Sequence, residues 1–362
     1  MKKLSLILVF VLVLSLLAGC AGTPVIYYTE CDCPEGGVMA EPAPAPQETP
    51  SDAPAAEGAL KTGLHIAANV KDSKAATAEE NGEAKYDVTM VAVLVDDEGI
   101  IRDCIIDGIA ASVKFDNTGA ITTDLTAPVQ TKNELGENYG MVAWGGAIAE
   151  WDEQAASFAS YVIGKTVEEV KGIAIDENTK PTDADLKSSV TIKIGGFITA
   201  VEAAVNNAQH LGAEAGDVLK LASVNGTDSS TAATADKDGN AQLDCTVTAM
   251  TMNGDVITSC AIDAVQAKVA FGTAGELKSD VTAPVQTKNE LGENYGMVAW
   301  GGAIAEWDAQ AASFAAYVTG KTAEEVSGIA VDESTKPTDA DLLASVTIKI
   351  GGFQALIAKA AQ

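Results

Sequence analysis

The sequence predicts an α+β protein built from two tandem copies of an antiparallel sheet with packed helices. The segment TAPVQTKNELGENYGMVAWGGAIAEWD at 126–152 recurs unchanged at 282–308, an offset of 156 residues. Solenoid repeats run only about 20–50 residues, so this longer period indicates a duplicated domain. Within each copy, β-branched runs come first and helical apolar spacing follows. We define module one as residues 59–209 and module two as residues 213–362.

The first half of each module predicts strands. In module one, β-branched runs at 86–95 and 99–106 are separated by an acidic turn, and a third strand is expected at 111–115. In module two the corresponding hairpin turns at Asn253-Gly254, which is a strong signal for a two-residue hairpin. The counterpart of the third strand is 267–271. We therefore expect an antiparallel sheet in each module.

The second half of each module predicts helices. In module one, an apolar stripe with helical spacing is formed by Ile148, Trp151, Ala155, Phe158 and Val162. Gly164 is expected to end this helix, and Thr166 with Glu169 has the pattern of a capping box for the next one. A turn with capping character is expected at 181–185, and an apolar helix at 197–205 closes the module.

The first 20 residues predict an export signal with a lipid-attachment site. Lys2 and Lys3 precede an apolar run at 4–17 that is too short to span a membrane comfortably. The run leads into Leu-Ala-Gly-Cys at 17–20, which resembles a bacterial lipobox. The resemblance implies cleavage before Cys20 and a lipid on its thiol, which would anchor the protein on the extracellular face of the cell membrane. The alternative is an ordinary secretory signal with an incidental cysteine.

The composition after the signal indicates a tether and excludes some partners. Residues 21–58 are rich in Pro, Ala and acidic residues without apolar periodicity, which predicts a disordered segment. The formal net charge is -28. Nucleic acid is excluded as a partner, because phosphate binding needs clustered Lys and Arg.

Histidines and cysteines argue against a triad or metal enzyme. His65 and His210 have no counterparts in the other module, so a function shared by both modules does not depend on them. Cys104 and Cys260 are equivalent positions, and we expect both to be buried strand residues. A bridge or a metal site at the tether's Cys-Asp-Cys (31–33) stays open.

The segment before the closing helix resembles the flavin-attachment motif of FMN-binding domains from bacterial surface electron-transfer proteins. In that family, Asp-x-x-Ser/Thr-Gly-Ala-Thr precedes an apolar helix. Its last Thr carries FMN through a phosphoester bond made by a flavin transferase. Module one matches with Asp185, Ser188 and Thr191, and has Ser189 and Val190 in place of Gly and Ala.

The second module carries the same motif with one further departure. Asp341 and Thr347 match, while Ala344 replaces the Ser, Ser345 the Gly and Val346 the Ala. The segments ELGENYGM, EWDEQAASFASYVIGKT and KPTDADL are also similar to secreted FMN-domain lipoproteins of Gram-positive bacteria. This resemblance covers most of both modules.

The resemblance implies an FMN-binding-domain fold and a role in extracellular electron transfer. Each chain would carry two covalent FMN groups, on Thr191 and Thr347, and would pass electrons from a membrane donor to extracellular acceptors. The protein would be an electron carrier and not an enzyme, and we expect a monomer. Two alternatives stay open: a non-redox surface lipoprotein with binding or structural modules, and a protein that binds flavin non-covalently.

The repeated segment supplies candidates for the apolar, partly aromatic slot that an isoalloxazine ring needs. The candidates are Tyr139, Met141, Trp144, Tyr295, Met297 and Trp300. Gly145 and Gly146 would allow the backbone to approach a ring closely. For Trp151 and Trp307, which lie on the helix stripe, we expect plain core packing.

Overall fold

The computed structural model describes residues 58–362, and both modules belong to one compact unit. The expected signal peptide at 1–20 with Cys20, and the tether up to residue 57, lie outside the described residues. Within 58–362, no helix is both long and apolar enough to cross a membrane.

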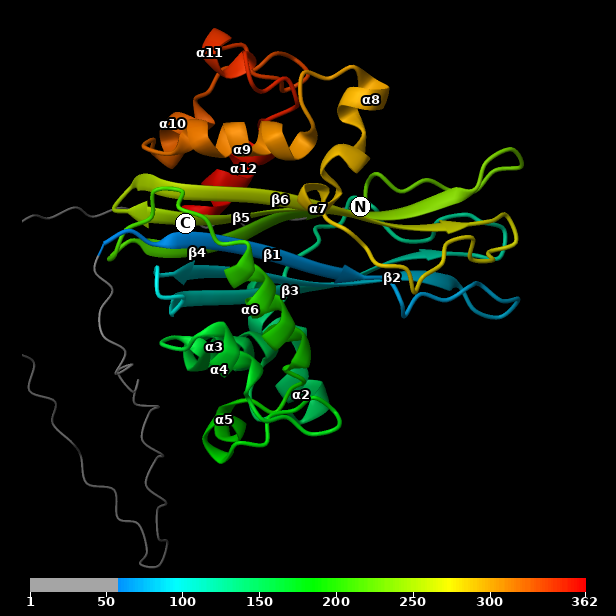
Figure 1. The fold of residues 1–362 in the computed structure, drawn as a ribbon. Helices are drawn as coiled ribbons and strands as arrows, with labels where there is room; N and C mark the ends of the chain where they lie inside the picture. Colours follow the sequence, from blue (N-terminus) through cyan, green and yellow to red (C-terminus); the bar gives the residue numbers. More distant parts are fainter. Residues whose placement is uncertain (1–57) are drawn as a thin grey trace, which may run out of the picture. The chain divides into compact units, whose positions relative to one another are not determined.

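Each module forms a three-stranded antiparallel sheet with helices packed on it (Figure 1). The strand orders are β1-β2-β3 in module one and β4-β5-β6 in module two. The strands are β1 (Lys61–Asn69), β2 (Gly82–Val95), β3 (Ile101–Phe115), β4 (Val218–Gly226), β5 (Gly239–Asn253) and β6 (Val256–Phe271). The α+β class with two similar halves is therefore confirmed.

The middle strand of each sheet is buried on both faces. Along β2, Val88, Met90 and Ala92 belong to one core, while Val91 and Val93 belong to another. Successive side chains of a strand point to opposite faces, so this alternation places β2 between two apolar layers. In β5, every second residue from Ala241 to Ala249 belongs to the first core, while Met250 and Met252 belong to the core under the helices of module two.

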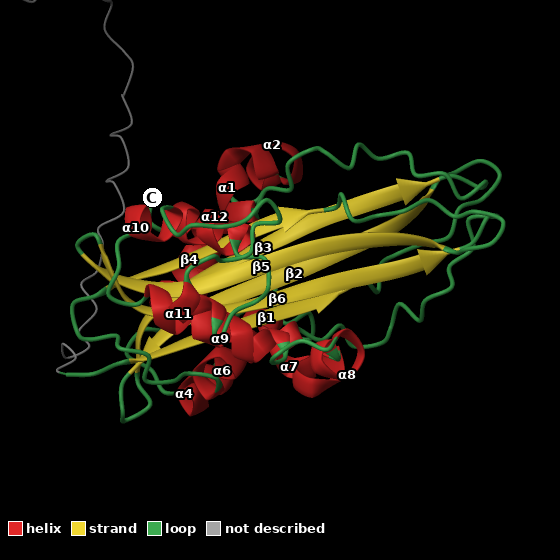
Figure 2. Ribbon diagram, turned by 90° about the horizontal axis from the view of Figure 1, so that it is seen from above, coloured by secondary structure: helices red, strands yellow, loops and turns green. Residues whose placement is uncertain are grey.

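The helices of each module cover the outer face of its own sheet. In module one, α3 packs on β3 and α6 packs on β1 and β2; in module two, α9 packs on β6 and α12 on β4 and β5 (Figure 1). Figure 2 shows the strands extending past the helices at one end. The helices are α1 (Lys132–Leu135), η1 (Gly136–Tyr139), α2 (Met141–Gly145), α3 (Trp151–Val162), α4 (Val167–Lys171), α5 (Ala184–Ser189), α6 (Gly195–Asn206), α7 (Lys288–Leu291), η2 (Gly292–Tyr295), α8 (Met297–Gly301), α9 (Trp307–Val318), α10 (Ala323–Ser327), α11 (Ala340–Leu343) and α12 (Gly351–Ala360).

The inner faces of the two sheets share one apolar core, which contains residues from β1 to β6. Two reciprocal backbone hydrogen bonds connect equivalent positions across it. Ala76 N donates to Gly275 O at 2.8 Å, and Ala233 N donates to Gly119 O at 2.9 Å. The module boundaries in the sequence are therefore not boundaries between separate cores. Each sheet needs the other to cover its inner face.

The capping signals of the helices are confirmed. Thr166 and Glu169 form a capping box at α4, and Asp183 caps α5 by accepting from Asp185 N and Leu186 N. Gly164 follows α3 with φ 82, the left-handed conformation that favours glycine.

Three features of the local fold differ from the sequence-based expectation. The two runs expected as separate strands at 99–106 and 111–115 form one strand, β3. Strand β1 was not expected at all. Ile148 lies outside the helix and is exposed, since α3 begins at Trp151.

Candidate functional site

The loop that carries Thr191 is held by a buried glutamine of helix α3. Gln154 Oε1 accepts from Thr191 N at 2.8 Å, from Thr191 Oγ1 at 3.2 Å and from Ile192 N at 3.2 Å. Gln154 Nε2 donates to Ala149 O at 2.8 Å. This one side chain therefore ties the predicted attachment loop to the end of the loop that contains Trp144.

The same arrangement occurs in module two. Gln310 Oε1 accepts from Thr347 N at 2.8 Å, from Thr347 Oγ1 at 3.2 Å and from Ile348 N at 3.2 Å. Gln310 Nε2 donates to Ala305 O at 2.7 Å. Both threonines are partly exposed.

An amide oxygen offers two lone pairs, yet three donors converge on each glutamine. The two backbone N–H groups alone satisfy that oxygen. The threonine hydroxyl is therefore a surplus donor, and converting it to an ester would leave no buried group without a partner.

The Gly-rich loop before α3 is closed by a glutamate. Glu150 accepts from Met141 N at 2.7 Å and from Val142 N at 2.9 Å, and it is buried. The loop enters α2 through Gly140, whose φ is 80. A side chain at Gly140 would collide with the indole of Trp144, so the glycine lets that ring lie against the backbone.

The aromatic candidates divide into buried and exposed residues. Trp144 is 91% exposed and Trp300 is 90% exposed. Tyr139 and Met141 are partly buried and pack against the helix–sheet core of module one, as Tyr295 and Met297 do in module two.

Trp151 and Trp307 are buried in the same helix–sheet cores, as expected from the helix stripe. Cys104 and Cys260 are buried strand residues, also as expected.

A lysine lies under the aromatic residues in each module. Lys288 Nζ is 4.6 Å from the ring centre of Trp307 and 4.9 Å from that of Tyr295. Burial lowers the pKa of Lys288 to about 8. The equivalent Lys132 is 3.7 Å from the carboxylate of Asp87.

In module two, the aspartate equivalent to Asp87 is Asp244, and its carboxylate has different partners. Asp244 accepts from the side-chain amides of Gln242 and Gln266, at 2.8 Å from each. Within 58–362, no carboxylate forms an ion pair with Lys288. This ammonium therefore lacks the close carboxylate that Lys132 has.

A pocket of about 300 Å³ lies between Lys288 and the start of α12. Its wall includes Trp307 and Phe353, whose rings meet edge to face with centroids 5.8 Å apart. Ile348 and Lys349, the two residues after Thr347, also line it. The volume is at the lower end of the range of small-molecule sites. Two lysines and two aromatic rings suit an anionic aromatic ligand.

The other motif residues have local structural roles. Ser188 Oγ donates to Asp185 O at 2.7 Å, and Ser189 Oγ donates to Leu186 O at 3.3 Å. These serines satisfy carbonyl groups of α5, and Asp185 lies exposed in its first turn.

In module two, Ser345 Oγ donates to Leu342 O at 3.4 Å, and Asp341 is exposed in the first turn of α11. Val190 and Val346 are buried in the helix–sheet cores. The motif residues other than the threonines thus shape the turn that leads to each threonine.

Gln154, Gln310 and two strained threonines were not predicted from the sequence. Thr179 and Thr335 have φ of 61 and 62, in the left-handed region that β-branched residues rarely adopt. Thr179 O accepts from Ile194 N at 2.8 Å, and its side chain would collide with any side chain at Gly195. This strained conformation helps to position the start of α6. No short-range pattern in the sequence predicts the strain.

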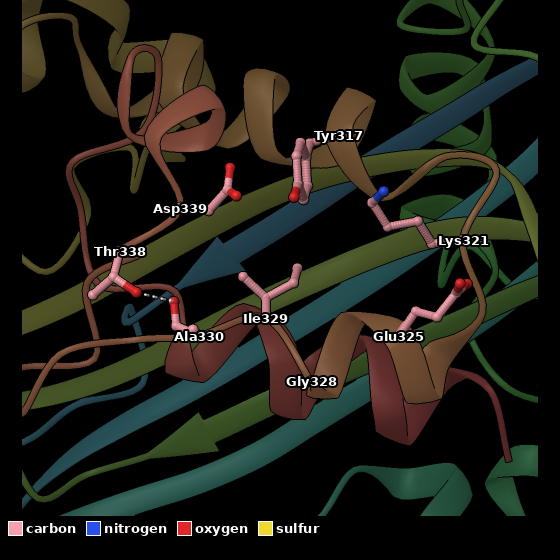
Figure 3. A pocket seen from close by; sticks show the side chains of 8 residues that line it. All are labelled: Tyr317, Lys321, Glu325, Gly328, Ile329, Ala330, Thr338 and Asp339. Atoms are coloured by element: carbon pink, nitrogen blue, oxygen red, sulfur yellow. Dashed lines mark hydrogen bonds between the residues drawn. The ribbon is translucent and has the colours of Figure 1, made fainter.

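A different hollow, of about 370 Å³, lies in module two beside α10 (Figure 3). Its side chains are already engaged within the protein. Lys321 Nζ is 4.5 Å from the ring centre of Tyr317, and Thr338 Oγ1 donates to Ala330 O at 3.2 Å. Glu325 closes the capping box of α10. We assign no ligand to this hollow.

In the part of the chain that the structure describes, no group of three or more His, Cys, Asp and Glu side chains is placed to hold a metal ion. No family model matches this chain, and neither does any curated protein or solved structure with which it was compared.

Proposed function

We propose that this chain is a lipid-anchored, extracytoplasmic electron-transfer protein that carries FMN on Thr191 and Thr347. Each module would have an FMN-binding-domain fold, and the chain would act as a carrier and not as an enzyme. A flavin transferase would attach the groups, a membrane protein would donate electrons and an extracellular compound would accept them. The mature chain would sit on the outer face of the cell membrane through a lipid on Cys20.

The observation that carries this proposal is the surplus hydroxyl donor at each threonine. Gln154 and Gln310 fix the backbone on both sides of the hydroxyl, while the hydroxyl itself is not needed to satisfy them. A phosphoester at Oγ1 would keep both backbone hydrogen bonds. The repetition of this geometry in two modules supports one modification per module.

The pocket beside Thr347 supports the chemical class of the group. FMN supplies one- and two-electron transfer when it is bound, and the chain holds, shields and tunes it. Lys288 and Lys349 would stabilise negative charge on a phosphate or on the ring. Trp307 and Phe353 would provide an apolar wall that limits contact with water.

Co-expression with a flavin transferase tests the proposal. On a denaturing gel, the wild-type chain is expected to fluoresce as a flavoprotein, because a covalent flavin survives unfolding. A chain with both Thr191→Val and Thr347→Val is expected to be dark, since valine keeps the shape of threonine but lacks the hydroxyl.

Two alternatives lead to different results in the same experiment. A non-covalent flavin binder would be yellow in its native state and dark on the denaturing gel. A non-redox surface lipoprotein with binding or structural modules would contain no flavin in either state. The exposed Trp144 and Trp300 favour this second alternative, since exposed aromatic side chains suit a binding surface.

A further inference from the structure

A cleft of about 800 Å³ lies between the two modules, and its lining contains acidic and histidine side chains but no lysine or arginine. Module one contributes β1, the last residue of α6 and the segment after it, while module two contributes β6, α7 and α9. The ionisable side chains in the lining, apart from Cys260, are His65, His210, Asp263, Glu290 and Asp308.

Glu134 of module one is equivalent to Glu290 of the cleft and lies on the opposite side of the molecule. Its carboxylate forms an ion pair with a lysine of this same chain. Lys359 of α12 forms an ion pair with Glu134 of module one and donates to Ser223 O at 2.7 Å. Glu134 also accepts from Thr131 N at 2.8 Å as part of a capping box. One carboxylate therefore serves both the helix cap and the lysine.

Glu290 repeats this arrangement without the lysine. It accepts from Thr287 N at 2.9 Å in the same capping box. In α6, however, Ala203 stands at the position that Lys359 has in α12. Among the described residues, no lysine or arginine forms an ion pair with Glu290.

The neighbouring groups in the cleft do not replace the missing cation. Burial lowers the pKa of His65 despite the nearby Glu290, which disfavours the charged form of its imidazole. Asp263 is buried, and its carboxylate accepts hydrogen bonds from uncharged donors, such as Ala264 N at 2.7 Å. Asp308 has a buried carboxylate oxygen without a hydrogen-bond partner, as its equivalent Asp152 does. The cleft thus brings together three carboxylates, of which Asp263 is buried, Asp308 is partly buried and Glu290 is exposed to a ligand in the cleft.

We propose that this cleft binds a small organic amine whose ammonium group takes, beside Glu290, the place that Lys359 takes beside Glu134. The apolar side chains of Leu64, Ile262 and Ala312 would contact its carbon chain. A metal ion fits less well, since residues 58–362 contain no cluster with metal-ligand geometry. The inference is independent of flavin attachment, because the cleft and the attachment loops share no residue.

Calorimetric titration of the protein with n-butylammonium tests this inference, and n-butanol serves as the uncharged control. The wild-type chain is expected to bind the amine and not the alcohol. Glu290→Gln is expected to weaken amine binding at least tenfold, although glutamine preserves the capping box. The matched Glu134→Gln variant is expected to change amine affinity less than twofold, because the carboxylate of the cleft stays intact.

A second variant tests the comparison between Glu290 and the ion pair of Glu134 with Lys359. Ala203→Lys gives α6 the lysine of α12, and this side chain is expected to occupy the position beside Glu290 and to abolish amine binding. Circular dichroism confirms that the variant is folded. The inference is overturned if the wild type binds no amine, if the alcohol binds equally well, or if folded Glu290→Gln or Ala203→Lys protein binds the amine as the wild type does.

Discussion

Phe115 and Phe271, which occupy equivalent positions in the two modules, stack on each other with ring centroids 4.0 Å apart and ring planes 6° apart. Contact between two equivalent residues places them at a local two-fold relation between the modules. The duplicated halves therefore associate as the subunits of a symmetric dimer do, although they belong to one chain. Both rings are fully buried in the core between the sheets.

We predict that Phe115→Ala and Phe271→Ala each lower the free energy of unfolding by about 3–5 kcal/mol, because each leaves a cavity in a packed core. The double variant is expected to lose less than the sum, since the two rings share one contact. Urea unfolding measures the three values. Trp144→Ala is the control and is expected to change stability by less than about 0.5 kcal/mol, as its ring is exposed. Additive losses would show that the two rings do not stabilise each other.

The glutamine that holds each attachment loop gives a prediction that separates its role from that of the hydroxyl. Gln154→Ala leaves the N–H groups of Thr191 and Ile192 without their acceptor, and we expect a loss of about 2–4 kcal/mol. Thr191→Val removes only the surplus donor, so we expect a loss below about 1 kcal/mol. Hydrogen exchange at the two amides is expected to accelerate in the first variant only. Equal losses in both variants would mean that the hydroxyl is structurally required.

Asp263 gives a prediction about pH. Burial raises its pKa from 3.8 to about 6, so between these values the folded protein binds more protons than the unfolded chain. Stability from this group therefore falls as pH rises through that window, by up to about 3 kcal/mol. Asp263→Asn keeps the hydrogen-bond acceptor without the charge. The stability advantage of the variant over wild type is expected to grow from pH 4 to pH 7, and parallel denaturation curves at the two pH values would contradict this.

Membrane anchoring is predicted to depend on the thiol of Cys20. Wild-type protein from its native host is expected to enter the detergent phase on phase separation, and Cys20→Ala is expected to stay in the aqueous phase. The lipid supplies the apolar surface for partitioning, because the acidic chain itself carries a net charge of -28. Aqueous partitioning of both proteins would show that Cys20 carries no lipid.

Local signals predicted the turns and helix ends, because short-range chemistry decides them. A hairpin turn was expected at Asn253-Gly254, but the structure places its two loop residues one position later, at 254–255, because Asn253 still pairs with Val256. Gly254 takes the positive φ of 56 at the first loop position. The break expected in β3 was wrong for a long-range reason. Asp107 and Gly108 interrupt the β-branched pattern, but Asp107 accepts from Asn133 N at 3.1 Å and a side chain at Gly108 would meet Val88 O.

The packing of one module on the other had a signal in the sequence that was not used. The uninterrupted apolar run 90–95 is typical of a strand buried on both faces, which requires a second layer beyond the helices of its own module. Strand β1 has few β-branched residues, so its own strand propensity is low. Its hydrogen-bonded pairing with β2 stabilises the extended conformation instead.

The site was only partly predictable. The threonines followed from a motif, but each lies 37 residues from its glutamine partner, which is Gln154 in module one and Gln310 in module two. Each glutamine stands in an ordinary helical stretch. The position of Trp144 depends on the left-handed conformation of Gly140. A glycine in the sequence allows this conformation but does not require it.

Intact mass spectrometry of the chain co-expressed with a flavin transferase counts the attached flavins directly. We predict two FMN groups on wild-type protein, one on each of Thr191→Val and Thr347→Val, and none on the double variant. Flavin retained on the double variant would place the attachment elsewhere. Wild-type protein without any FMN, beside a control protein that the same transferase modifies, would rule out flavin attachment and leave a non-redox surface lipoprotein as the better explanation.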